Sequence, residues 1–150
     1  MLWIKVRLLD YCREYVQQRM DTAQKAIEAA QASAREETKS SAGDKYETGR
    51  AMMQLEVEKN SIQLAEARKL NPVLDQIQVT YRHTTIALGS LVITDHGNFL
   101  IAISAGQYIL DEVVYLIISP ITPLGVKLAG MKEGDSFTFN QRSYVIQQVW

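Results

Sequence analysis

The chain has 150 residues, 47% of them hydrophobic, and a formal net charge of -1 at pH 7. This length fits one domain or two small ones, and the charge balance gives no reason to expect unassisted binding to nucleic acid. Cys12 is the single cysteine, which excludes a disulfide framework and a multi-cysteine zinc site. The longest apolar run, residues 113–118, is too short to span a bilayer. We therefore expect a soluble, cytoplasmic protein with no membrane partner.

Residues 9 to about 37 show the period of an amphipathic helix. Apolar residues recur at intervals of three or four, and no proline or glycine interrupts the stretch. The side chains at these positions become smaller toward the C-terminal end of the stretch, where alanine recurs. The positions are Leu9, Cys12, Val16, Met20, Ala23, Ile27, Ala30 and Ala34. We predict a coiled-coil seam along a helix of roughly 27 residues, on the order of 40 Å long.

A second helical pattern runs from about residue 50 to residue 70. Its apolar side consists of Met53, Val57, Asn60, Leu64 and Ala67. Turn-forming and capping residues fill the linker over residues 39–49. Because the linker is short, we predict that the two helices are antiparallel neighbours. Asn71-Pro72 should end the second helix, which gives a helical hairpin over residues 1–71 and a second domain over residues 72–150.

Asp44 and Glu47 lie in this linker, three residues apart, at the tip of the predicted hairpin. No core at such a tip needs carboxylates, and three interpretations are open. The acids can be plain solvated charges, or they can cap the second helix, with Asp44 at N-cap and Glu47 at N3 in a capping-box-like pair. In the third interpretation, a long rigid arm delivers both carboxylates into the active site of another protein.

Beyond Pro72 the apolar period changes to two, and β-branched residues gather in short runs. Thr122 as N-cap and Pro123 at N1 should start a short helix that Gly130 closes. The predicted strands are residues 91–95, 99–104, 108–110, 113–118, 135–139 and 144–149. The predicted fold class is α+β: an antiparallel coiled-coil hairpin, followed by a small antiparallel sheet with one short helix.

The run from Ser119 to Asp135 resembles the carboxy-terminal domain of the GreA/GreB transcription elongation factors. That family carries Ser/Thr-Pro-Leu-Gly, two residues, Leu, one residue, Gly, three residues and Gly-Asp, and this chain matches from Thr122 to Asp135. The family also has a preceding helical hairpin whose tip reads Gly-Asp-x-x-Glu, as residues 43–47 do here. The two matches occur in the family's order and together cover nearly the whole chain.

The resemblance implies an FKBP-like second domain and a function in transcription. Members of the family dock on bacterial RNA polymerase and place the hairpin in its secondary channel, where the tip acids help to cleave the 3′ end of a backtracked transcript. On this resemblance we expect a monomer that is no enzyme by itself and has no cofactor of its own, but shares Mg²⁺ with the polymerase. Asp44 and Glu47 would be the catalytic residues, Asp44 on the second metal and Glu47 on the attacking water.

The resemblance also implies sites for the polymerase and for the nascent RNA. We expect the polymerase to contact the loop and helix start at Ile121, Thr122 and Pro123. After the tip glutamate the family usually reads Asn-Ala-Glu-Tyr, whereas residues 48–51 here read Thr-Gly-Arg-Ala. Positive charge that could hold the RNA backbone comes instead from Lys39, Lys45 and Arg50, with plain solvation as the alternative.

Three other functions stay open. The chain can be a channel-binding regulator without cleavage activity, since divergent members of the superfamily inhibit the polymerase. The implied FKBP-like shape also allows a prolyl isomerase, although the few aromatic residues after residue 71 follow strand patterns that suggest a core. A plain coiled-coil adaptor is the third. His83 and His96 are too isolated in the sequence to predict a shared metal site.

Overall fold

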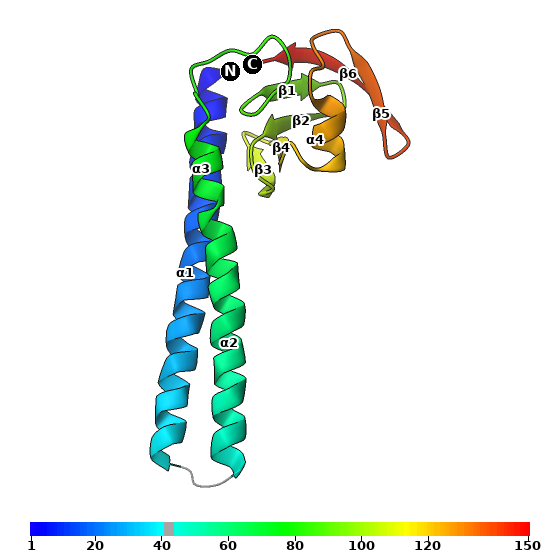
Figure 1. The fold of residues 1–150 in the computed structure, drawn as a ribbon. Helices are drawn as coiled ribbons and strands as arrows, with labels where there is room; N and C mark the ends of the chain where they lie inside the picture. The colour runs from blue at the N-terminus through cyan, green and yellow to red at the C-terminus, as the bar shows by residue number, and fades with distance from the viewer. Residues whose placement is uncertain (41–43) are drawn as a thin grey trace. The chain divides into compact units, whose positions relative to one another are not determined.

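The structure is a computed structural model that describes residues 1–40 and 44–150, with side chains described for residues 1–36 and 47–150. The chain is α+β, with a long N-terminal helix and a mixed six-stranded sheet that carries a short helix (Figure 1). It forms two compact units. The helical unit is Glu14–Asn71, and the sheet unit combines Met1–Arg13 with Pro72–Trp150. A functional division into residues 1–71 and 72–150 stays a prediction.

In the helical unit, α1 (Leu2–Ser40) and α2 (Asp44–Arg68) lie side by side and run in opposite directions (Figure 1). Their facing sides meet in a cluster of Ala23, Ile27 and Leu64, with partly buried Met20 and Val57 packed against it. The buried positions follow the period read from the sequence, because one stripe of each helix faces the other. Among the described residues, no helix combines the length and apolar character needed to cross a membrane.

Helix boundaries differ from the predicted ones at three places. α2 begins at Asp44 instead of about residue 50, and α1 continues to Ser40, so most of the predicted linker over residues 39–49 is helical. α1 begins at Leu2 instead of Leu9, because Lys5 and Leu8 extend the buried stripe toward the N-terminus. α2 ends at Arg68, and a further short helix, α3 (Leu70–Asp75), follows at once. Pro72 lies in the first turn of α3, where a missing N–H leaves no intrahelical bond unmade. This proline therefore belongs to the start of a helix and does not end the preceding one.

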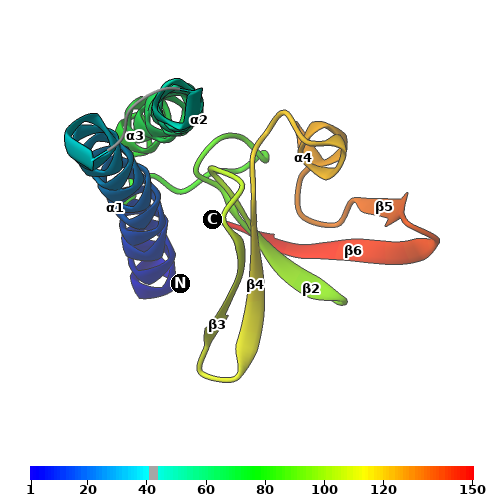
Figure 2. The same cartoon turned by 90° about the horizontal axis from the view of Figure 1, so that it is seen from below.

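The strands lie close to the predicted positions. Their order in the sheet is β3-β4-β2-β1-β6-β5, and Figure 2 shows the β3–β4 hairpin beside β2. The bounds are β1 Leu91–Thr94, β2 Gly97–Ile101, β3 Gly106–Leu110, β4 Val113–Ile118, β5 Ser136–Phe139 and β6 Arg142–Val149.

The prediction of an antiparallel sheet is wrong at one pair of strands. β2 and β4 run parallel, with Asn98 opposite Tyr115 and Ile101 opposite Ile118, while the other pairs are antiparallel. The chain leaves β2, forms the edge strand β3, and returns beside β2 as β4. A period of two shows which residues share a face of the sheet, but it carries no information on the direction of a neighbouring strand.

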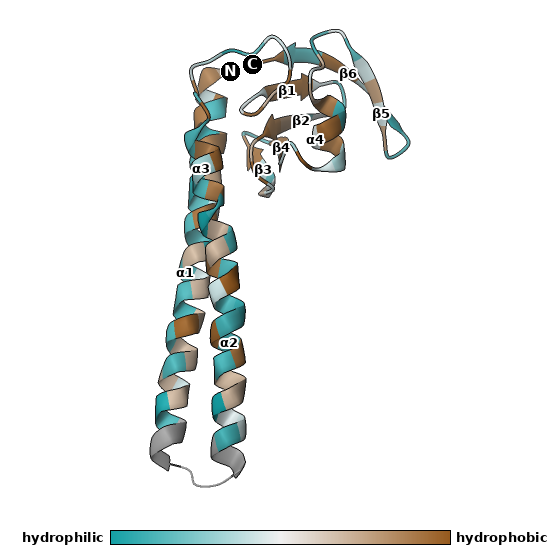
Figure 3. Ribbon diagram, in the orientation of Figure 1, coloured by the Kyte–Doolittle hydropathy of each residue, from teal (hydrophilic) through white to brown (hydrophobic). Residues whose placement is uncertain are grey.

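Helix α4 (Pro123–Leu128) covers one face of the sheet, as Figure 2 shows. Thr122 caps it as predicted: its hydroxyl accepts a bond from the Gly125 N–H at 3.1 Å and donates one to the Ser119 carbonyl at 2.7 Å. The buried core beneath α4 is aliphatic and aromatic, and Figure 3 shows apolar residues concentrated on the strands and α4. It consists of Ile86, Val92, Phe99, Ile101, Ile118, Leu124, Leu128, Phe137, Ile146 and Val149.

Candidate functional site

The first candidate site is the end of the helical unit where α1 stops and α2 starts. α2 begins at Asp44, which places Glu47 in its first turn with an exposed side chain. Arg50 is also exposed and lies three residues further along, so it shares a helix face with Glu47. The side chains of Lys39, Asp44 and Lys45 lie outside the described residues, and their predicted roles stay predictions.

Chemically, this end of the helical unit can present carboxylate oxygen to a partner. Glu47 is exposed and follows the start of a helix, where backbone N–H groups favour negative charge. Carboxylate oxygen is a preferred ligand of Mg²⁺ and can also accept a proton from water. Among the described residues, no group of three or more His, Cys, Asp or Glu side chains is placed to hold a metal ion. Glu47 could therefore complete a metal site, but only together with groups from another molecule.

The second candidate site is the surface around the start of α4. Ile121 is 86% exposed and Pro123 is exposed as well. Thr122 differs from both, since its hydroxyl is engaged in the helix cap. Val126 adds an apolar side chain that is 63% exposed. The sequence analysis missed Val126, although Leu124 and Leu128, four residues apart, already define the buried face and leave position 126 on the other side.

Most of the run that carries the family resemblance also has a packing role. A Cβ on Gly125 would lie 2.2 Å from the Ser119 carbonyl oxygen, so no other residue fits there without a shift of the backbone. Gly130 and Gly134 have φ values of 79° and 91°, in the region that glycine adopts most readily. The glycines of this run are therefore explained by the fold of the α4 segment, and they do not by themselves point to a function.

Several aromatic side chains of the sheet unit belong to its core. Phe99 and Phe137 are buried, and Tyr144 packs against the same cluster. The rings of Phe137 and Tyr144 are stacked with their centroids 4.8 Å apart. An isomerase site would need aromatic side chains around an open pocket, whereas these three contribute to packing, as their strand patterns predicted.

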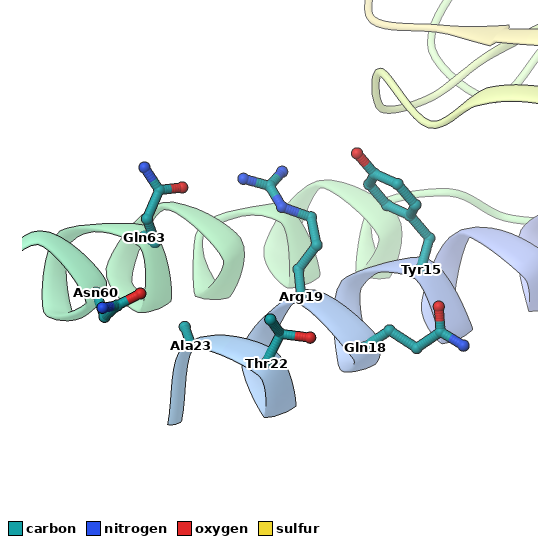
Figure 4. A pocket seen from close by; sticks show the side chains of 7 residues that line it. All are labelled: Tyr15, Gln18, Arg19, Thr22, Ala23, Asn60 and Gln63. Atoms are coloured by element: carbon teal, nitrogen blue, oxygen red, sulfur yellow. The ribbon is translucent and has the colours of Figure 1, made fainter. Parts of the chain in front are cut away.

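An open groove of about 330 Å³ runs along the helical unit between α1 and α2. The Arg19 guanidinium lies 5.8 Å from the centre of the Tyr15 ring. Figure 4 shows Tyr15, Arg19 and Gln63 pointing to one side, with Gln18 directed away from them. The polar groups are spread along the groove and do not converge on one point, so the groove has the character of a polar surface and not of an active site.

No protein-family model matches this chain, and no curated protein matches it. The likeness to the GreA/GreB factors therefore rests on two short stretches, residues 43–47 and residues 122–135, and on their order in the chain.

Proposed function

We propose that this protein binds bacterial RNA polymerase at its secondary channel and stimulates cleavage of backtracked RNA, as GreA/GreB factors do. The observation that carries the proposal is the position of Asp44 and Glu47. α2 begins at Asp44, and Glu47 is exposed in the first turn, so Glu47 is not needed for a buried seam. In this proposal α1 and α2 act as an antiparallel coiled-coil hairpin, and residues 72–150 act as an FKBP-like docking domain.

The packing of the two helices supports a slender arm. Three of the side chains buried in the helical unit are alanines: Ala23, Ala30 and Ala67. Small side chains at a helix contact allow the two axes to approach closely, toward the lower end of the usual 8–10 Å range. A two-helix arm of this kind is narrow enough to suit a channel, and its end can carry groups that the channel wall lacks.

The proposed chemistry follows from the residue types. Two-metal hydrolysis of a phosphodiester needs both Mg²⁺ ions held and a water positioned for attack. Mg²⁺ takes oxygen ligands and keeps several waters, so an external carboxylate can complete the shell of a weakly held second ion. Asp44 would supply that oxygen, and Glu47 would orient or deprotonate the water. Lys39, Lys45 and Arg50 would hold the RNA backbone.

The docking part of the proposal uses the surface around α4. Ile121, Pro123 and Val126 present exposed apolar groups beside one another in the chain, and Thr122 fixes the start of the helix that displays them. Exposed apolar side chains of this kind commonly mark a protein contact. Ile121→Asp should weaken binding to the polymerase about tenfold or more. Ile109→Asp, at an isoleucine of β3 that is 64% exposed, should not.

The decisive test uses a backtracked bacterial elongation complex and follows the length of the RNA on a gel. Asp44→Asn and Glu47→Gln should each reduce stimulated cleavage by about 100-fold, the typical contribution of a positioned general base. Both variants should still melt near the wild-type temperature and compete with wild type for the polymerase. Glu58→Gln, the same change at an exposed position further along α2, is the matched control and should cleave normally.

Other outcomes distinguish the remaining functions. Cleavage at the wild-type rate by both tip variants, at saturating factor and Mg²⁺, would remove the catalytic assignment. If wild-type protein binds the polymerase and inhibits it without cleavage, the protein is a channel-binding regulator. If it does not bind polymerase at all, the resemblance to the GreA/GreB factors does not indicate the function of this protein. A prolyl-peptide turnover assay then tests the isomerase alternative.

A further inference from the structure

A separate cavity of about 200 Å³ lies in the sheet unit, between the first turns of α1, the segment before β1 and the residue that follows β6. Six of the residues that line it are Leu2, Lys5, Val79, Tyr81, Arg82 and Trp150. A cavity of about 150 Å³ can hold a benzene molecule. This space is therefore large enough for a single aromatic ring with a small substituent.

Lys5 is the unusual residue in this cavity. Its side chain is only 2% exposed, and its Nζ donates a hydrogen bond of 2.8 Å to the Tyr81 carbonyl oxygen. An ammonium group carries three N–H donors, and within the described part of the chain this carbonyl is the one acceptor that Lys5 reaches. Burying a charge with so few partners is unfavourable. A lysine placed here therefore suggests that a further acceptor enters from the cavity.

The second cation at the cavity is Arg82. Its guanidinium lies 3.8 Å from the centre of the Trp150 ring, which orients the group without neutralising it. Lys5 and Arg82 both line the cavity, and none of the described residues that line it is acidic. The remaining wall is largely apolar, with Leu2, Val79 and the Trp150 ring. Two cations in a largely apolar lining are complementary to an anion that has an apolar body.

We propose that this cavity binds a small organic carboxylate of about the size of benzoate. The carboxylate would accept charge-assisted hydrogen bonds from Lys5 and Arg82, and the apolar part would lie against Leu2, Val79 and Trp150. A bare inorganic anion would leave those apolar walls uncovered and is a poorer fit. The proposal is independent of the transcription function, because it uses neither the tip acids nor the surface around α4.

The test is a titration of the full chain with benzoate, followed by the amide signals in ¹H–¹⁵N NMR spectra. We expect saturable shifts at residues 2–6, 79–82 and 150, with a Kd of about 1 mM, which is reasonable for so small a ligand. Benzamide has the same shape without the charge and should bind at least tenfold more weakly. Inorganic phosphate should give no saturable shift at these residues.

Variants locate the site. Lys5→Met keeps the length of the side chain and removes the charge, so benzoate affinity should fall at least tenfold. Lys25→Met, at an exposed lysine further along the same helix, is the matched control and should bind as wild type does. If Lys5→Met does not fold by circular dichroism, Arg82→Gln takes its place, since Arg82 is exposed and its change leaves the buried ammonium intact.

Three results would overturn the proposal. The first is an absence of saturable shifts at benzoate concentrations about tenfold above the expected Kd. The second is equal binding of benzoate by wild type and by a folded Lys5→Met or Arg82→Gln variant. The third is equal affinity for benzoate and benzamide, which would show that the cavity selects shape and not charge. None of these readouts depends on RNA polymerase, so failure here is distinguishable from failure of the proposed function.

Discussion

The helical unit and the sheet unit are stabilised in different ways. Among the described residues of the helical unit, half of the well-buried apolar side chains are alanines, and the larger ones are Val16, Ile27 and Leu64. In the sheet unit, leucine, isoleucine and phenylalanine form a core between a sheet and α4. Burial of apolar area is the main stabilising contribution to folding. The helical unit is therefore stabilised by a few contacts along one stripe, while the sheet unit is stabilised by the burial of many side chains.

This difference bears on where functional information lies. In the sheet unit, Gly125 is required by close packing and Thr122 by the helix cap. The residue types at these positions are therefore explained by the fold. In the helical unit, Glu47 is exposed, so packing does not account for an acid at this position. The unit with the smaller core is thus the one whose exposed residues say more about function.

The largest effect is expected from a charge in the stripe of the helical unit. Val16 is fully buried, and Val16→Asp should cost about 3–5 kcal/mol because it leaves an unpaired charge in the seam. Helicity by far-UV circular dichroism should drop, while the fluorescence of Trp3 and Trp150, both in the sheet unit, should change little. Gln18→Asp, at an exposed neighbour, is the control. Unchanged helicity in Val16→Asp would mean that the seam is misplaced.

A single methyl group should be nearly as disruptive in the sheet unit. Gly125→Ala puts a Cβ 2.2 Å from the Ser119 carbonyl oxygen, and relief requires movement of the backbone. The free energy of unfolding should fall by about 3 kcal/mol, measured as a lower urea midpoint by tryptophan fluorescence. Val126→Ala, at the next and exposed position of α4, should change it by less than about 0.5 kcal/mol. Equal midpoints for the two variants would contradict the close approach.

A smaller effect is expected from pH, and it should be confined to the sheet unit. Burial, and then the positive charge of Lys5, lower the pKa of His83 below its ordinary value of 6.5. The unfolded chain therefore binds a proton more readily than the folded chain, and stability is lost as pH falls below 6.5 toward the folded pKa. Urea midpoints at pH 7.5 and 5.5 measure this loss. His83→Gln should reduce it.

The same histidine connects this pH effect to the cavity at Lys5. Lys5→Met removes the second cause of the shift, so an NMR titration should find the pKa of His83 closer to 6.5. Lys25→Met should leave the titration unchanged. A pKa that does not move in Lys5→Met would show that burial alone is responsible.

The smallest effect is expected at a hairpin turn, and it is a gain. Asp111 and Glu112 join β3 to β4 with φ values of 50° and 66°, a pair of left-handed residues that suits a type I′ turn and favours glycine. Glu112→Gly should raise the free energy of unfolding by about 0.5 kcal/mol, measured by urea unfolding. Gln141→Gly, at the matching position of the β5–β6 turn, should act similarly. Glu112→Ala should give no gain, since alanine has the same steric conflict.

Features fixed by local chemistry could be predicted from the sequence. Thr122-Pro123 specifies a helix start, and the run of β-branched and apolar residues over 113–118 specifies a strand, so both could be predicted. The parallel pairing of β2 with β4 was not found, because it depends on where β3 turns in space. The burial of Lys5 could not be predicted for a similar reason, because the residue that accepts its hydrogen bond, Tyr81, is 76 positions away in the chain.

The position of the candidate site at the end of the helical unit could be predicted from the sequence, but the geometry of the site could not. The two helical patterns and the glycines between them located Asp44 and Glu47 at the start of α2. Their proposed chemistry requires a metal and a substrate supplied by another molecule, and no pattern within this chain specifies that geometry. The position of Ile121 beside the helix cap could be predicted from the residue order. Its near-complete exposure follows from how Leu124 and Leu128 direct α4 toward the core.

The sheet unit is assembled from two separated pieces of chain, Met1–Arg13 and Pro72–Trp150, and this affects the order of events on a ribosome. The helical unit is complete in sequence once residue 71 has been synthesised. Residues 1–13 must then wait for the remaining chain, roughly 4–16 s at the usual 5–20 residues per second. During that interval Leu8 and Leu9, both buried in the finished protein, lack the rest of the unit to which they belong. The nascent N-terminal segment is therefore a natural target for chaperones that capture exposed apolar helix.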